Sequence, residues 1–262
     1  MIKETERSSE RLVKRMTKKL IIDAAKGTVQ APDKSGNYHS FDYHDLVVAG
    51  CDVQSYNRWF LDRTLPEWEE TGIADELRKF NDATYLEIGV NCGCSMVWAM
   101  NTFANQGWGI DAFENANPRK DRNWAGLRMA RIFAEENLRA YEQTRYQGEP
   151  FDPGDDGRFV ELLEMKSTRA LSGWLASSIE IQPFDVVFVD GDHYAGQAII
   201  DLSLSFQLLK PGGLIVADDM DKLFSAGRML SRTAIMAFWQ CFSNKLDPVY
   251  VGQRQACFRK TK

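Results

Sequence analysis

From Thr84 onward, the sequence alternates short apolar runs with longer helix-like segments, and this alternation limits the folds that the chain can adopt. The apolar runs end in acidic residues or glycine, which is typical of parallel strands connected by helices. The last two runs are joined by turn residues and predict a terminal hairpin. The predicted strands are Tyr85–Ile88, Gly107–Ile110, Phe159–Leu163, Asp185–Val189 and Leu214–Ala217, followed by the hairpin strands Pro248–Val251 and Ala256–Arg259. The pattern therefore predicts an α/β fold with a doubly wound, mostly parallel sheet of seven strands and an antiparallel last strand.

Two parts of the chain lie outside this pattern. Residues 1–80 are polar and helix-like, and we expect them to form an N-terminal helical extension or cap with a loop or linker at Gly27–Tyr38. Residues 81–262 are expected to form the sheet domain. An excursion at about 113–158 separates the second and third strands, and the segment Trp124–Tyr146 predicts a helical insertion there.

Composition excludes several other classes of protein. The net charge of −5 gives no general attraction to nucleic acid or to anionic membranes, and we expect neither as a partner. No apolar run approaches the roughly 20 residues of a membrane span, and the charged N-terminus lacks the apolar stretch of a secretory signal. The five scattered cysteines predict reduced thiols. We therefore expect a cytoplasmic protein with a small-molecule partner, and the sequence leaves open whether it forms a homo-oligomer.

A glycine turn follows the first predicted strand and leads into a helix over Met96–Phe103. The turn, from Gly89 to Ser95, reads Gly-Val-Asn-Cys-Gly-Cys-Ser. Glycine permits a tight turn with positive φ, and a strand-to-helix turn presents free backbone N–H groups that suit an anionic group of a ligand. In a dinucleotide-binding fingerprint the second and third glycines would fall at Asn91 and Cys94, so the sequence disfavours NAD.

The motif Glu-x-Gly-x-x-x-Gly at this turn resembles the first motif of class I S-adenosylmethionine (SAM) methyltransferases, whose fold is Rossmann-like. The resemblance implies that SAM binds at the turn. Asp111 ends the second predicted strand 22 residues after Gly89, where such folds place an acid that binds ribose hydroxyls. In the resembling family the turn after the third strand touches adenine, and Ser167 occupies that place. The expected cofactor-binding residues are Glu87, Gly89, Asn91, Gly93, Ser95, Asp111, Ser167 and Asp190.

Acidic residues follow the fourth and fifth predicted strands. Asp190 and Asp218 are 28 residues apart, about one strand–helix–strand unit, so we expect both carboxylates at the same edge of the sheet. Like charges that converge raise one another's pKa or require a cation. Because the candidate ligands are oxygens and no cysteine is placed to join them, the pattern favours a divalent cation such as Mg²⁺, Mn²⁺ or Ca²⁺ over zinc, with Mg²⁺ expected.

These acidic motifs resemble the metal-dependent O-methyltransferases of the catechol and caffeoyl-CoA group. The segments Phe188–His193 and Leu208–Asp219 are most similar to the macrocin-type branch, which modifies antibiotic sugars. The resemblance implies that Asp190, Asp218 and Asp219 bind the metal and that His193 accepts the proton. Asp219 stands where the catechol branch has asparagine, and Asp218 stands where the macrocin branch often has glutamate.

Together these features predict metal-dependent methyl transfer from SAM to a hydroxyl of a small molecule. A vicinal diol, on a sugar or a catechol ring, is the expected acceptor, because two neighbouring oxygens can chelate one ion. One alternative is a metal-independent methyltransferase that acts on nitrogen or a carboxylate. Another is a SAM-binding module without chemistry. A DNA amino-methyltransferase is disfavoured, because Asp190 is followed by Gly191-Asp192-His193 instead of the Pro-Pro turn of that group.

Overall fold

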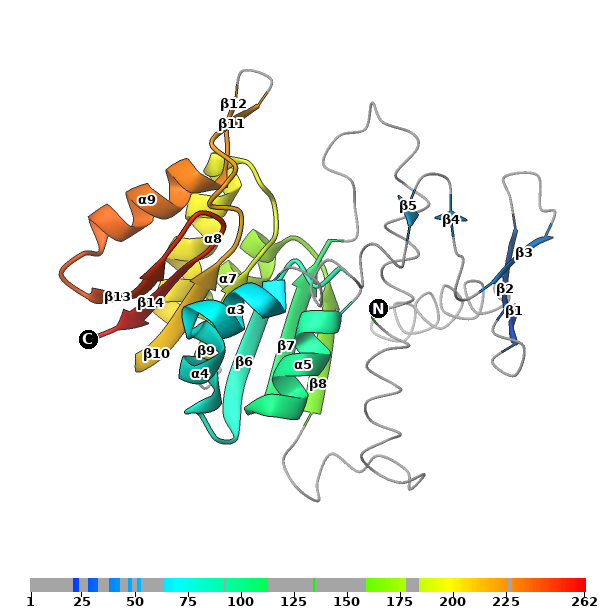
Figure 1. The fold of residues 1–262 in the computed structure, drawn as a ribbon, viewed down its shortest axis with the longest axis horizontal. Helices are drawn as coiled ribbons and strands as arrows, with labels where there is room; N and C mark the ends of the chain where they lie inside the picture. Colours follow the sequence, from blue (N-terminus) through cyan, green and yellow to red (C-terminus); the bar gives the residue numbers. More distant parts are fainter. Residues whose placement is uncertain are drawn as a thin grey trace. The chain divides into compact units, whose positions relative to one another are not determined.

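The protein is described from a computed structural model of the 262-residue chain (Figure 1). The described residues are 21–23, 28–32, 38–42, 47–48, 51–52, 64–91, 93–112, 134, 159–177, 184–225 and 228–262. The chain divides into two units, Met1–Tyr56 and Asn57–Lys262, and each is described by itself. None of the helices in the described ranges has both the length and the apolar character that crossing a membrane requires.

The described segments of the first unit are short strands, which corrects the prediction of a helical extension for this part of the chain. β1 (Ile21–Asp23), β2 (Thr28–Pro32) and β3 (Tyr38–Asp42) form an antiparallel sheet, and β4 (Val47–Val48) pairs with β5 (Cys51–Asp52). The β-branched pairs in β1 and β2 favour strands, and the polar sequence between β2 and β3 is typical of a hairpin loop. The predicted linker at Gly27–Tyr38 thus contains β2. The boundary between the units lies after Tyr56, not after residue 80.

A mixed sheet of seven strands dominates the second unit and confirms the predicted fold class. Its strands are β6 (Ala83–Ile88), β7 (Ala104–Asp111), β8 (Phe159–Glu164), β9 (Phe184–Val189), β10 (Leu209–Ala217), β13 (Leu246–Val251) and β14 (Ala256–Lys260). Their spatial order is β13-β14-β10-β9-β6-β7-β8. The pairs from β10 to β8 are parallel, whereas β14 runs antiparallel to β10 and to β13. The strand order reverses at β6 and β9, where an open α/β sheet has its ligand crevice.

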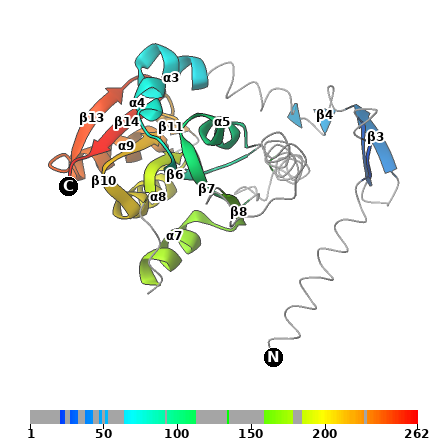
Figure 2. The ribbon, with the colours of Figure 1, turned by 90° about the horizontal axis from the view of Figure 1, so that it is seen from below.

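Helices cover both faces of this sheet (Figures 1 and 2). On one side lie α3 (Leu65–Thr71), α4 (Ile73–Arg78) and α5 (Cys94–Thr102), and on the other lie α7 (Ser167–Ala176), α8 (Ala195–Leu208) and α9 (Ser231–Cys241). A short hairpin of β11 (Phe224–Ser225) and β12 (Arg228–Met229) precedes α9. The predicted insertion at 113–158 lies outside the described residues except for the helical Ala134.

Successive side chains of the central strands point to opposite faces of the sheet, and this alternation produces two apolar cores, one on each face. In β9, Val187 and Val189 pack on the α8 side, and Val186 and Phe188 pack on the α3 side. All four side chains are buried, so the strand is apolar on both faces, as expected for a parallel strand inside a layered α/β fold. The acidic residue that follows the strand, Asp190, presents a charge at its carboxyl end, whereas Asp185 near its start pairs with Lys210.

The short helices α3 and α4 belong to the sheet unit, because their apolar residues pack on its core. Trp68 is only 2% exposed, and its ring meets those of Phe188 and Trp98 edge to face, with centroid distances of 5.2 and 5.4 Å. Such aromatic contacts contribute beyond simple area burial. Trp68 is therefore a core residue of the sheet unit.

We expect Trp68→Ala to lower the free energy of unfolding by about 3–5 kcal/mol, because it leaves a cavity against β9. Trp68→Phe, which keeps a ring against Phe188, is the matched control and should cost less. Urea denaturation followed by circular dichroism measures both. Equal stability of Trp68→Ala and the wild type would contradict the assignment of α3 to this core.

Candidate active site

The glycine turn after β6 brings two backbone segments into direct contact. Gly89 has φ +88°, and a Cβ built there would lie 2.1 Å from the backbone oxygen of Asp190. Any side chain at this position would therefore collide with the turn that follows β9. Asn91 and Gly93 also have positive φ, and α5 begins directly after Gly93. The predicted cofactor turn and the predicted acidic turn are thus neighbours at one edge of the sheet.

Three N–H groups of this turn, those of Gly89, Asn91 and Gly93, are bonded within the protein. The Gly89 N–H donates to the Ile110 carbonyl at 2.9 Å, and the Gly93 N–H donates to the Val90 carbonyl at 2.8 Å. The Asn91 N–H donates to Asp111 Oδ2 at 2.9 Å. The physical reason is the parallel pairing of β6 with β7, which carries the Asp111 carboxylate beside the turn. These bonds hold the turn in shape, and its contact with a ligand stays a prediction.

Glu87 lies under the turn and is completely buried. Ser95 Oγ donates to one of its carboxylate oxygens, and Tyr85 Oη donates to the other at 2.8 Å. Burial raises the pKa of Glu87 to about 8, although these two hydrogen bonds act to lower it. Glu87 and Ser95, both predicted to bind the cofactor, are thus brought together, and their contact ties β6 to the first turn of α5.

Ser167 begins α7 at the edge where cofactor binding is predicted, but its hydroxyl points to a protein partner. It donates to Asp201 Oδ1 at 2.6 Å and accepts a hydrogen bond from Gln197 Nε2 at 3.2 Å. The hydroxyl of Ser167 is therefore bonded within the protein, and the contact of this residue with adenine stays a prediction. Nothing in the local sequence signalled Asp201, which lies 34 residues further along the chain.

Two acids and a histidine converge where β9 and β10 end. A carboxylate oxygen of Asp190, an imidazole nitrogen of His193 and a carboxylate oxygen of Asp219 all lie within 4.8 Å of one another. His193 Nδ1 forms an ion pair with Asp219 Oδ2, and Lys222 Nζ lies 2.5 Å from Asp219 Oδ1. The strands β9 and β10 are paired in parallel, as the 28-residue spacing predicted. This pairing is why the acids share one edge.

Asp218, which was also predicted as a metal ligand, makes a different contact. Its Oδ1 accepts a hydrogen bond from Gln255 Nε2 at 3.2 Å, and both residues are buried. It is not part of the group formed by Asp190, His193 and Asp219 among the described residues. Gln255 reaches Asp218 because β14 pairs with β10, and the sequence offered no signal for this contact.

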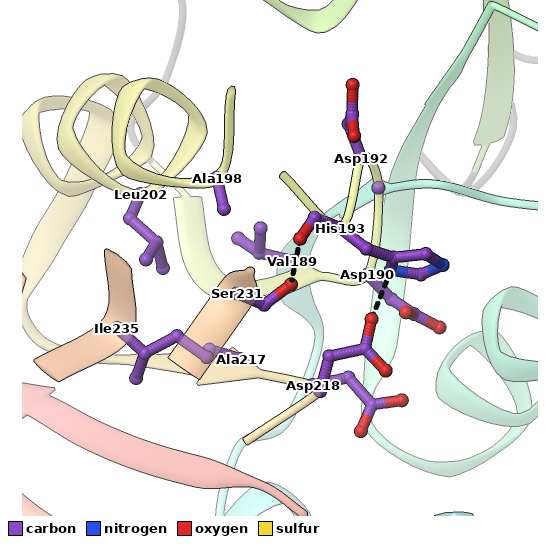
Figure 3. Close-up of a pocket in the computed structure, with 12 residues that line it drawn as sticks. Val189, Asp190, Asp192, His193, Ala198, Leu202, Ala217, Asp218, Ser231 and Ile235 are labelled. Carbon is purple, nitrogen blue, oxygen red and sulfur yellow. Dashed lines mark hydrogen bonds and ion pairs between the residues drawn. The ribbon is translucent and has the colours of Figure 1, made fainter. Parts of the chain in front are cut away.

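The loop that carries His193 is fixed from several directions. The Asp190 N–H donates to the Ile88 carbonyl at 2.8 Å, and the Tyr194 N–H donates to Asp192 Oδ1 at 2.9 Å. Ser231 Oγ, at the start of α9, donates to the His193 carbonyl at 3.1 Å (Figure 3). The Asp192 side chain points away from the carboxylates of Asp190 and Asp218 (Figure 3). The imidazole itself remains half exposed.

Crowding of the carboxylates sets their protonation. Burial and the neighbouring charges of Asp218 and Asp219 raise the pKa of Asp190 well above its usual range. Burial and Asp219 also raise the pKa of Asp218. Burial alone would raise the pKa of Asp219, but the contacts with His193 and Lys222 lower it below its ordinary value. Among the described residues, Lys222 pairs with Asp219, and the positive charge of Arg254 acts on Asp218.

A small pocket opens at this edge and combines an apolar floor with a polar rim (Figure 3). Its lining residues are Val189, Asp190, Gly191, Asp192, His193, Ala198, Leu202, Ala217, Asp218, Asp219, Ser231 and Ile235. The pocket thus contains the convergent titratable groups that are typical of an active site.

A sequence profile of a methyltransferase-domain family matches residues 86–220, which include both turns and more than half of the chain. The chain belongs to this methyltransferase family. The predicted kinship with class I SAM-dependent methyltransferases is thereby confirmed. No curated protein matches this methyltransferase significantly.

Solved structures show the same fold. An O-methyltransferase from Bacillus cereus, solved in complex with S-adenosylhomocysteine (SAH), is 15% identical with a TM-score of 0.52, and the match covers 84% of this chain and 96% of that one. The O-methyltransferase TomG from Streptomyces achromogenes, involved in tomaymycin synthesis and solved with SAM, is 16% identical with a TM-score of 0.53, covering 84% and 94%.

We expect Gly89→Ala to abolish SAM binding and to lower the free energy of unfolding by more than about 2 kcal/mol, because the new Cβ meets the Asp190 backbone at a strained φ. Gly173→Ala in α7, where a Cβ meets nothing within 4 Å, is the control and should stabilise the protein by up to about 1 kcal/mol. Calorimetry with SAM and thermal unfolding measure both effects. A Gly89→Ala protein that binds SAM normally would disprove this packing argument.

The buried carboxyl group of Glu87 should make stability depend on pH. Its pKa rises from an ordinary 4.5 to about 8 on folding, so the folded protein holds a proton that the unfolded chain releases between these values. The free energy of unfolding should therefore fall as the pH rises from about 4.5 to 8, by up to about 1.4 kcal/mol per pH unit from this group, and level off above 8. Glu87→Gln should flatten that slope in urea titrations at pH 6, 7 and 8. An unchanged slope would show that Glu87 does not bind this proton.

Proposed function

We propose that this methyltransferase transfers the methyl group of SAM to a hydroxyl of a small molecule, with a divalent cation held by the carboxylates of Asp190 and Asp219 and with His193 as the base. The observation that carries the proposal is the convergence of these three side chains, whose donor atoms lie within 4.8 Å of one another beside the glycine turn. SAM, when bound, supplies the methyl group for an in-line displacement by the acceptor oxygen. The names of the O-methyltransferases that share the fold support oxygen as the acceptor atom.

The donor set fits a divalent cation. Carboxylate oxygens are the ligands that Mg²⁺ and Mn²⁺ sites use, Asp190 and Asp219 supply two of them, and no described cysteine lies in the group. The raised pKa of Asp190 reflects repulsion that a cation would relieve. The chemistry that such an ion supplies when bound is the polarisation and orientation of a hydroxyl oxygen. Asp218 stays a candidate ligand by prediction, and it would have to leave Gln255 to serve as one.

His193 is placed to accept the acceptor's proton. Its Nδ1 faces Asp219, which fixes the imidazole and leaves Nε2 as the nitrogen that can take a proton. The ring is half exposed, so an acceptor entering the pocket reaches it. Ser231 holds the backbone of His193, and the wall formed by Leu202 and Ile235 limits water on the apolar side. A hydroxyl deprotonated in this position becomes the nucleophile that methyl transfer needs.

A metal-independent methyltransferase is the second candidate function. The His193–Asp219 pair alone has the arrangement of a base held by a carboxylate, and Lys222 already provides a positive charge at Asp219. In this alternative the carboxylates are structural, and the acceptor atom can be nitrogen or a carboxylate oxygen. The two candidates differ in whether removal of divalent ions abolishes turnover.

The deciding experiment measures SAH formation with catechol and with methyl rhamnoside as diol probes, with Mg²⁺ and with EDTA. We expect turnover only with the ion. Asp190→Asn should weaken Mn²⁺ binding, measured by calorimetry, and lower turnover by orders of magnitude while SAM affinity stays within about threefold. His193→Gln should lower kcat by about 10²–10⁴, the usual contribution of a general base.

Each other outcome has a definite meaning. Full turnover of the wild type in EDTA would reject the metal and support the His193–Asp219 alternative. SAM binding without turnover on any acceptor, including amines and carboxylates, would support a binding module without chemistry.

A further inference from the structure

Asp201 is a buried carboxylate that the proposed reaction does not use. It lies on α8 and is only 1% exposed. Its Oδ1 accepts two hydrogen bonds, from Ser167 Oγ at 2.6 Å and from Gln197 Nε2 at 2.8 Å. Burial raises the pKa of Asp201 to about 6, although both donors act to lower it. Burying a carboxylate costs free energy, so its presence between two turns of the active site calls for a structural or functional reason.

The second carboxylate oxygen of Asp201 lies at the other turn of the site. Asp201 Oδ2 is 3.7 Å from the position that a Cβ at Gly191 would take. The charge of Asp192 also raises the pKa of Asp201, which agrees with the proximity of this turn. One side chain therefore contacts the residue that begins α7 and lies beneath the loop between Asp190 and His193.

We propose that Asp201 is a positioning residue that fixes the Asp190–His193 loop relative to the start of α7. This inference rests on the proposed function, because the two turns flank the site predicted for SAM. Ser167 lies at the turn after β8, where adenine is expected, and Asp190 and His193 lie where the acceptor is expected. Asp201 Oδ1 is bonded to Ser167 at the first turn, and Oδ2 lies near Gly191 at the second, so we expect Asp201 to resist a shift of either turn relative to the other.

The geometry separates two kinds of contact in this network. The hydroxyl of Ser167 and the amide of Gln197 both donate hydrogen bonds to Oδ1 of Asp201. The other carboxylate oxygen, Oδ2, lies near Gly191 in the Asp190–His193 loop. Asp201→Asn can keep an oxygen for Ser167 and Gln197 while it replaces the other oxygen by an amino group. Ser167→Ala removes the opposite contact and leaves the carboxylate intact. The two variants thus test separately the contacts of the two carboxylate oxygens of Asp201.

The experiment measures SAH affinity by calorimetry and the NMR resonances of the His193 ring in the metal-free full chain. Asp201→Ala should weaken SAH binding about tenfold, as expected for loss of a hydrogen bond to a buried charge, and should shift the His193 resonances. Asp201→Asn should keep SAH affinity within about threefold and still shift the His193 resonances. Ser167→Ala should weaken SAH binding and leave the His193 resonances in place.

Ser205→Ala is the matched control, because Ser205 lies one turn further along α8, is fully buried, and its hydroxyl has no hydrogen-bond partner among the described residues. It should change neither readout, and melting temperatures report any general loss of stability. Asp201 variants that lower only the melting temperature, or an Asp201→Asn protein identical to the wild type in its His193 resonances, would overturn the proposal. Absence of SAH binding by the wild type would contradict the proposed function, while the His193 resonances would still test the role of Asp201.

Discussion

The contact between the backbones of Gly89 and Asp190 is the constraint on which the rest of the site depends. Parallel pairing of β6 with β9 ends both strands at the same level, and the Asp190 N–H continues the pairing by donating to Ile88. Only a residue without a side chain fits at Gly89, because the Asp190 carbonyl occupies the position of a Cβ. The turn expected to hold the cofactor and the turn that bears the acids are therefore one packed unit.

The negative charge at this edge is only partly balanced by neighbouring groups. Asp219 lies between His193 and Lys222, whereas Asp190 and Asp218 are crowded by acids and bear raised pKa values. Such a site is poised for a cation or for a substrate that carries positive charge. The sulfonium of SAM is one such group, and a divalent ion is another. The same crowding of carboxylates costs free energy of folding. The hydrogen-bonded loop around His193 keeps the acidic residues in place despite this cost.

The sequence predicted those features that depend on short-range patterns. Apolar runs gave the strands of the sheet, and the spacing of Asp190 and Asp218 predicted a shared edge. Contacts between distant segments were missed: Gln255 meets Asp218 through the pairing of β14 with β10, and the hydroxyl of Ser167 binds Asp201 instead of facing a ligand. No local signal encodes such contacts, because they arise when the whole sheet is formed. The strands of the first unit were misread because their polar residues suggested helix.

The antiparallel strand β14 has a consequence for how the protein is made. Strand β10 supplies Asp218 and Asp219, yet one of its edges is completed only by residues 256–260. During synthesis, every other strand that borders the acids has left the ribosome before β14 does. Until then β10 exposes unpaired backbone groups, and Asp218 lacks Gln255. Strand β14 is thus the last strand of the sheet to be synthesised, and Asp218 can gain its partner Gln255 only after the rest of the sheet sequence has been made.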